Sequence, residues 1–215
     1  MSAVFTPRGV LGVKLAMLGA LGVASGVLGL LVWHARDLEH LGDPLAQPIP
    51  FSHKHHVGDD GIDCRYCHTT VETSAYAGLP STHICLSCHS QLYTDAAPLA
   101  LLRESAAIGK PIEWQRVHSL PDFVYFNHSV HVNKGVACIE CHGRVDQMPI
   151  TWRAERLDMQ WCLGCHRNPA PHLRPLSQVF SMNRSMPTGA EADALARQMR
   201  LESERRRTDC STCHR

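Results

Sequence analysis

Five copies of one short motif, Cys-x-x-Cys-His, constrain this chain more than any other feature of its sequence. Numbered as boxes 1 to 5 in chain order, they are Cys64–His68, Cys85–His89, Cys138–His142, Cys162–His166 and Cys210–His214. They use all 10 cysteines, so none is left for a disulfide or a catalytic thiol. The motif is typical of haem c attachment, in which both cysteines form thioethers to the porphyrin and the histidine binds the iron. We therefore predict five covalently bound haem c groups.

The predicted attachment residues form two sets. The thioether residues are Cys64, Cys67, Cys85, Cys88, Cys138, Cys141, Cys162, Cys165, Cys210 and Cys213. The proximal iron ligands are His68, His89, His142, His166 and His214. Two other uses of cysteine pairs fit less well. Structural zinc takes four ligands, and an odd number of pairs leaves one over. A thioredoxin-like redox pair would lie in a βαβ pattern, which surrounds none of the boxes.

The boxes belong to an internal repeat. Residues 51–57 read FSHKHHV and residues 126–132 read FNHSVHV, and each stretch is followed by two boxes. The second boxes of the two copies are also similar, CLSCHS and CLGCHR. We therefore expect two related two-haem modules, a first module at 51–91 and a second module at 126–168.

The repeated histidine pairs are predicted distal iron ligands. On a helical turn, side chains three residues apart share a face, so two imidazoles so placed can each reach a different iron. This assigns distal positions to His53 and His56 in the first module and to His128 and His131 in the second. His55 has no histidine counterpart in the second copy, where Val130 stands, and is expected to be a bystander.

One distal ligand remains to be assigned. Our choice is His118, which lies in an apolar and aromatic segment that leads directly into the second module. The alternatives are His83, His172, Met148 and Met159. A methionine ligand would raise the potential of its haem relative to haems with two histidine ligands.

The N-terminal segment is predicted to anchor the chain in a membrane. Residues 10–33 are apolar except for Lys14, and a helix over the uncharged part alone would span about 28 Å, close to the hydrocarbon thickness of a bilayer. A cleaved signal peptide is the competing interpretation, but its apolar core is usually shorter. Arg8 and Lys14 precede the uncharged part of the span, which places residues 1–9 in the cytoplasm and the boxes on the periplasmic side of a bacterial membrane.

The remaining chain completes the expected organisation: a Pro-containing linker at 34–50, a connector at 92–125, and a C-terminal part at 169–215 that carries the fifth box. The connector is expected to hold a short helix at 98–108, and the C-terminal part a polar helix at 190–207 that lies on the surface or against a partner. Aromatic residues make up only 6%, too few for an ordinary core, so haem is expected to fill the interior. We predict a mainly irregular fold with short α-helices. The formal net charge of +1 argues against a nucleic-acid partner.

The arrangement Phe-x-His-x-x-His followed by a haem box resembles the class III multihaem cytochromes. In that family the first histidine binds the haem of the adjacent box and the second binds another haem. The resemblance implies that His53 pairs with His68 and His128 with His142, while His56 and His131 reach other haems.

A closer resemblance extends over residues 50–168. The segments FSHKHHV, IDCRYCH, AGLPSTHICLSCH, WQRVHSLPDFVYFNHSVH, CIECHGRVDQMP and MQWCLGCHR, behind one N-terminal anchor, resemble the pentahaem cytochrome subunit of alternative complex III. This bacterial membrane complex oxidises quinol. The resemblance implies an iron–sulfur subunit, integral membrane subunits and a monohaem cytochrome as partners, with a terminal oxidase as a further acceptor.

Three functions remain open. The leading hypothesis is an electron-transfer subunit that is not an enzyme on its own, because iron with two protein ligands has no site for a substrate. The second is a membrane-anchored multihaem quinol dehydrogenase that feeds a periplasmic reductase; such proteins usually place their first box closer to the membrane span. The third is a catalytic multihaem enzyme, which needs a haem with a vacant position.

Overall fold

The apolar N-terminal segment forms one long helix, α1 (Pro7–Glu39). The computed structural model describes residues 6–39, 41–183 and 185–214, so that residues 1–5 of the expected cytoplasmic segment lie outside the described range. Residues Pro7–Trp33 of α1 are long and apolar enough to cross a membrane. The helix begins before Val10 and runs beyond Trp33 into the segment expected to be a linker. The chain divides into two compact units, Met1–Leu41 and Gly42–Arg215.

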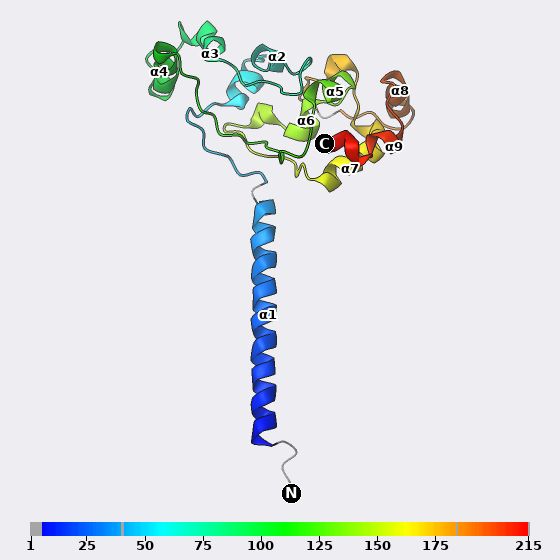
Figure 1. Cartoon of the computed structure of the whole chain (residues 1–215). Coiled ribbons are helices and arrows are strands. Elements are labelled where there is room, and N and C mark those ends of the chain that lie inside the picture. The colour runs from blue at the N-terminus through cyan, green and yellow to red at the C-terminus, as the bar shows by residue number, and fades with distance from the viewer. Residues whose placement is uncertain (1–5, 40, 184, 215) are drawn as a thin grey trace. The chain divides into compact units, whose positions relative to one another are not determined.

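The second unit consists of short helices joined by irregular chain (Figure 1). Its α-helices are α2 (Cys64–Cys67), α3 (Thr82–His89), α4 (Ala100–Ile108), α5 (His128–Asn133), α6 (Cys138–His142), α7 (Met159–Arg167), α8 (Ala190–Gln198), α9 (Glu204–Arg207) and α10 (Cys210–Cys213). The other helical turns are η1 (Lys54–Asp59), η2 (Ala97–Leu99), η3 (Val145–Gln147), η4 (Ala170–His172) and η5 (Leu176–Gln178). Within the described residues the only β-structure is isolated bridges. The predicted fold class, short helices in mainly irregular chain, is confirmed.

Each box lies on a helix, and three of these helices begin at an aspartate cap. The carboxylates of Asp63, Asp158 and Asp209 accept hydrogen bonds from backbone amides in the first turns of α2, α7 and α10. Such caps satisfy amides that have no partner inside the helix and commonly contribute about 1 kcal/mol. The caps therefore fix where these three boxes start.

The apolar core of this unit is divided into small clusters. One contains Val71, Val132 and Val179, which come from three distant parts of the chain. Another contains Leu173, Leu195 and Met199. Such clusters bury far less apolar surface than a continuous core, as expected for a unit whose interior is shared with a large prosthetic group.

The expected C-terminal helix at 190–207 is wrong in one respect, because the chain forms α8 and α9 with a break between them. At the break, Arg200 adopts a left-handed conformation with φ of 47°. The Nζ of Lys134 donates to the carbonyl of Met199 at 2.8 Å, and the buried Met199 packs with Leu173. These tertiary contacts end α8, and the buried Ala192 and Leu195 hold one face of this otherwise exposed helix against the unit.

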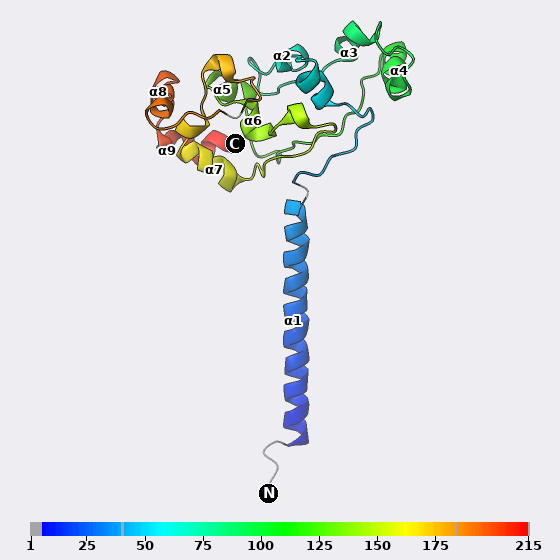
Figure 2. The same ribbon diagram turned by 180° about the vertical axis from the view of Figure 1, so that it is seen from behind.

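The two modules are interleaved along the unit. Turn η1 of the first module packs on η3, which follows box 3 in the second module. Reciprocally, α5 of the second module packs on residues 72–75, which follow box 1. Helices α3 and α4 lie together at one end of this unit, and α8 and α9 lie at the other (Figures 1 and 2).

Candidate functional site

The two predicted histidine pairs have the same local geometry. In the first module, Phe51 stacks on His56 with ring centroids 4.5 Å apart and meets His53 edge-on at 4.9 Å. In the second, Phe126 stacks on His131 at 4.5 Å and meets His128 edge-on at 4.7 Å. The histidines of the first module lie at the start of the π-helical turn η1, and those of the second lie on the α-helix α5. Each phenylalanine nevertheless contacts both of its histidines in the same way.

Three predicted distal histidines face the proximal histidines of different boxes. The ring centroids are 6.1 Å apart for His56 and His89, and 5.9 Å for His131 and His166. His128 and His142 lie 6.4 Å apart with ring planes at 12°. Two imidazoles on opposite sides of one metal ion, each bound at about 2 Å, have ring centres separated by about 6 Å. The spacing of all three pairs therefore fits one iron between the rings.

Hydrogen bonds orient most of these imidazoles through Nδ1. Backbone carbonyls accept from Nδ1 of His56, His68, His89, His128, His131, His166 and His214, at distances from 2.7 to 3.2 Å. A carbonyl can only accept, so Nδ1 carries the proton and Nε2 keeps its lone pair. Histidine ligands of metals in proteins are held in this manner. The residues present thus fit iron ligation through Nε2.

Burial keeps several of these imidazoles neutral. It lowers the pKa of His142 to about 3, with smaller contributions from the charges of neighbouring histidines. Burial is also the largest cause that lowers the pKa of His53 to about 4 and that of His131 below its ordinary value. A neutral imidazole is the form that binds a metal.

His118 carries the clearest sign of a missing partner. Its Nε2 is buried and has no hydrogen-bond partner, and burial lowers the pKa of the ring to about 4. A buried polar atom without a partner is uncommon and indicates an absent ligand or ion. Its ring lies 4.3 Å from that of His142, too close for both to lie on opposite sides of one iron. His214 instead faces Phe123, with centroids 5.8 Å apart.

The other residues considered for the last distal position lie in different surroundings. His83 is exposed on α3. Met148 is buried and Met159 is 66% exposed. The Nδ1 of His172 lies 3.0 Å from the carboxylate of Glu140, which raises the pKa of that histidine.

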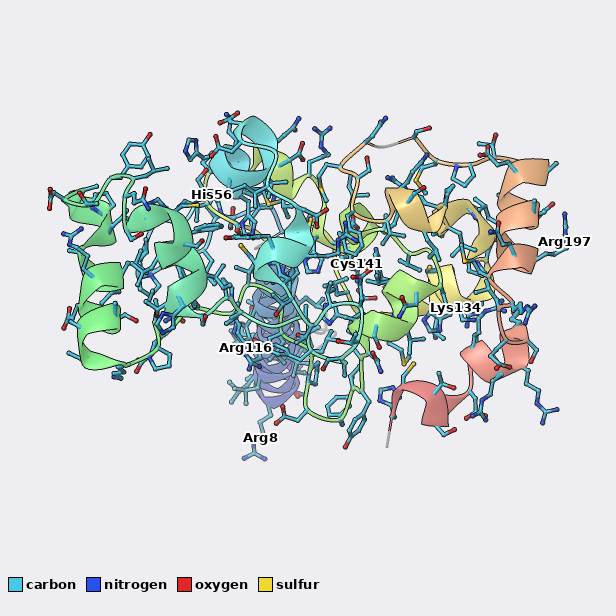
Figure 3. All side chains as sticks on the ribbon, turned by 90° about the horizontal axis from the view of Figure 1, so that it is seen from above. Arg8, His56, Arg116, Lys134, Cys141 and Arg197 are labelled. Carbon is cyan, nitrogen blue, oxygen red and sulfur yellow. The ribbon has the colours of Figure 1, made fainter. Side chains whose placement is uncertain are left out.

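The thiols place the boxes in a continuous spatial order. The thiols of Cys64 and Cys138 interact, which lowers the pKa of Cys64 and raises that of Cys138, so box 1 lies against box 3. Three further pairs of thiols are neighbours: Cys67 with Cys85, Cys141 with Cys165, and Cys162 with Cys213. In each pair the pKa of the first thiol is raised, mainly by burial and further by the charge of the neighbouring thiol. The order along the unit is therefore box 2, box 1, box 3, box 4 and box 5. Figure 3 labels Cys141 of box 3, which lies between α3 and α4 on one side and α8 on the other.

Within the described ranges, no three His, Cys, Asp or Glu side chains converge on a common point. Tetrahedral zinc would require four such ligands around one ion. The thiols and imidazoles are instead spread in a row.

Thr151 and Ala75 are site residues that the sequence did not suggest. The Oγ1 of Thr151 lies 2.8 Å from Nδ1 of His53, and the carbonyl of Ala75 accepts from Nδ1 of His128 at 2.8 Å. Both acceptors lie far along the chain from the histidine that they orient. No local pattern identifies them, because they depend on how the modules interleave.

Comparisons with known proteins find similarity to multihaem cytochromes c. Residues 124–215 match the family of cytochrome c7 and related cytochromes c. The chain is 40% identical over 127 residues to the multihaem cytochrome c subunit of menaquinone reductase from Nitratidesulfovibrio vulgaris (strain Hildenborough), covering 56% of this chain. The match spans 59% of that relative's length. Cytochromes c bind haem c covalently, and boxes 3, 4 and 5 lie within the matched residues. Residues 124–215 are therefore similar to multihaem cytochromes of the c7 type.

Proposed function

We propose that the chain is a membrane-anchored pentahaem c-type cytochrome that relays electrons within a quinone-linked membrane complex. The observation that carries the proposal is the row of boxes in which facing imidazoles are spaced for one iron. Haem, when bound, supplies a one-electron redox centre. The protein supplies the thioether cysteines, the axial histidines and the hydrogen bonds that fix their orientation.

The proposed axial pairs follow from the ring spacing. His56 pairs with His89, His131 with His166, and His128 with His142. His53 is assigned to His68, whose charge contributes to the lowered pKa of His53 after burial.

His118 is proposed as the last distal ligand because of its buried and unpartnered Nε2. With two protein ligands on every iron, no position is open to a substrate, and the subunit is not an enzyme on its own.

The helix α1 is proposed as the membrane anchor, with the haem-binding unit on the periplasmic side. Its apolar stretch Pro7–Trp33 suits a single span. Arg8 and Lys14 at the start of the helix agree with a cytoplasmic N-terminus under the positive-inside rule.

The number and state of the haems test this proposal. The purified full-length protein should contain five haems per chain, all low-spin, and its reduced spectrum should not change with carbon monoxide. A high-spin fraction that binds carbon monoxide would contradict closed coordination and favour a catalytic multihaem enzyme. Fewer than five haems would contradict the assignment of the boxes.

The direction of electron flow distinguishes two versions of the function. The sequence resemblance to the alternative complex III subunit favours quinol as the electron donor, with an iron–sulfur subunit upstream and a monohaem cytochrome or a terminal oxidase downstream. The relative described above is a subunit of a menaquinone reductase, which favours electron delivery to a quinone.

The purified complex separates these two versions. A menaquinol analogue should reduce the oxidised haems if quinol is the donor. Rapid oxidation of the pre-reduced haems by a menaquinone analogue, without reduction by the quinol, would support the second version. Quinol oxidation by the isolated subunit would instead support a small quinol dehydrogenase.

A further inference from the structure

We propose that Thr151 is a positioning residue for His53, and that the two modules orient each other's distal ligands. This inference rests on the proposed function, in which His53 is a distal iron ligand. It adds a residue from outside the haem boxes and the paired-histidine motifs, and it adds a dependence of one module on the other.

The contact at His53 differs in kind from those of the other oriented imidazoles. Its Nδ1 lies 2.8 Å from the hydroxyl oxygen of Thr151, whereas a backbone carbonyl accepts from Nδ1 of His56. With Nε2 directed to iron, Nδ1 carries the proton and donates to the hydroxyl oxygen. A side-chain hydroxyl can be removed by a single substitution, whereas a backbone carbonyl cannot, so the role of this acceptor can be tested by mutation.

The surrounding backbone holds Thr151 in place. The amide of Lys54 donates to the carbonyl of Met148 at 3.0 Å, and the amide of Leu45 donates to the carbonyl of Thr151 at 3.2 Å. A Cβ on Gly58 would lie 2.3 Å from the carbonyl oxygen of Asp146, so the two backbones approach each other closely there. The segment that orients His53 is therefore docked on the first module at several points.

The second module shows the reciprocal arrangement. The carbonyl of Ala75 accepts from both the amide and Nδ1 of His128, at 3.2 and 2.8 Å. The amide of Ser129 donates to the carbonyl of Ser74, and Asn133 Nδ2 donates to the carbonyl of Glu72. In each direction, the loop that follows the first box of one module holds the first distal histidine of the other.

This exchange has a consequence for the electronic state of iron. A hydrogen bond from Nδ1 to an acceptor makes the imidazole a stronger donor to the metal and fixes its ring plane. Stronger donation stabilises ferric over ferrous iron. Removing the acceptor at Thr151 should therefore raise the potential of the haem that His53 serves, and of that haem alone.

The test uses full-length holoprotein with Thr151→Val, Thr151→Ala and Thr151→Ser. Redox titration followed by absorbance and low-temperature electron paramagnetic resonance should show one haem with a raised potential and altered g values in the valine and alanine variants. The serine variant keeps the hydroxyl and should match the unmodified protein. Thr82→Val is the matched control, since the hydroxyl of this half-buried threonine bonds that of Ser105 at 2.7 Å.

Two outcomes would overturn the inference. One is five haems with unchanged potentials and g values in both the valine and the alanine variants. The other is a shift of equal size in Thr151→Ser, because the hydroxyl would then not be responsible. Haem content is measured on the same samples. A count below five in the unmodified protein counts against the proposed function, whereas five haems without a shift count only against the role of Thr151.

Discussion

The ring of Phe51 stacks on that of His56 with centroids 4.5 Å apart and planes at 25°. The second module repeats this contact between Phe126 and His131, at 4.5 Å and 27°. In both copies the stacked histidine donates from Nδ1 to a backbone carbonyl four residues before it. Stacking and this local hydrogen bond together hold the ring plane, so the sequence repeat is also a repeat of ligand geometry.

Replacing the stacked histidine of the second module tests its ligand role. His131→Met should keep five haems but raise the potential of one, because a thioether donates less charge to iron than an imidazole. Spectroelectrochemistry of the full-length protein measures the shift. His55→Met is the control, because His55 is exposed and lies near Asp59 and Asp60. An unchanged titration curve for His131→Met would remove His131 from the ligand set.

Removing the proposed last distal ligand should open one haem. In His118→Ala, one of five haems should become high-spin and bind carbon monoxide, while the other four keep their spectra. His83→Ala, at an exposed position on α3, should leave all five haems low-spin and unable to bind carbon monoxide. If His118→Ala remains entirely low-spin, another residue completes that iron and His172 becomes the next candidate.

The close approach of the modules at Gly58 predicts a loss of stability. A Cβ there would lie 2.3 Å from the carbonyl oxygen of Asp146, so Gly58→Ala must push η1 away from η3. Such overpacking typically costs about 1–3 kcal/mol. Gly61→Asn is the control, because Gly61 has open space around its Cβ position and a φ of 69° that asparagine tolerates. Equal melting temperatures for the two variants would contradict a tight contact.

The Glu140–His172 contact predicts a pH dependence. The hydrogen bond to Glu140 raises the pKa of His172 above its ordinary value of 6.5. The protonated form is thus favoured by folding, and its stabilising effect is complete below pH 6.5 and is lost as pH rises through the raised pKa. Arg174 is buried and lies 3.7 Å from the same carboxylate.

Thermal unfolding of His172→Gln and the unmodified protein checks this direction. The variant should be less stable at a pH below 6.5 and equally stable at a pH well above the raised pKa. His83→Gln serves as the control for loss of a histidine at an exposed site. A difference that grows with rising pH would show the opposite linkage.

Haem attachment is expected to be necessary for folding. The clusters around Val132 and Leu195 are small, so haem is expected to supply much of the apolar contact in the interior. The full-length chain produced without the attachment machinery should therefore lack native circular dichroism outside the signal of α1. A helical signal equal to that of the haem-bound protein, and thus larger than α1 alone supplies, would contradict this expectation.

The sequence by itself determined the chemistry of this protein. The informative patterns are local: five Cys-x-x-Cys-His boxes, two Phe-x-His-x-x-His copies and one apolar segment. Each of them can be recognised from one contiguous stretch of the chain. Aspartate caps such as Asp63 also act locally and set where box helices begin. These features predicted haem c, the distal histidine pairs, the anchor helix and the short-helix fold.

Only the tertiary structure decided the spatial order of the boxes and the partners of their ligands. Box 1 lies against box 3 through Cys64 and Cys138, and Thr151 reaches His53 from the other module. The break between α8 and α9 likewise depends on Lys134, which donates to the carbonyl of Met199. Such contacts join residues far apart in the chain, and they form only when the interleaved modules pack around a shared interior. Local propensity and motif spacing therefore do not predict that packing.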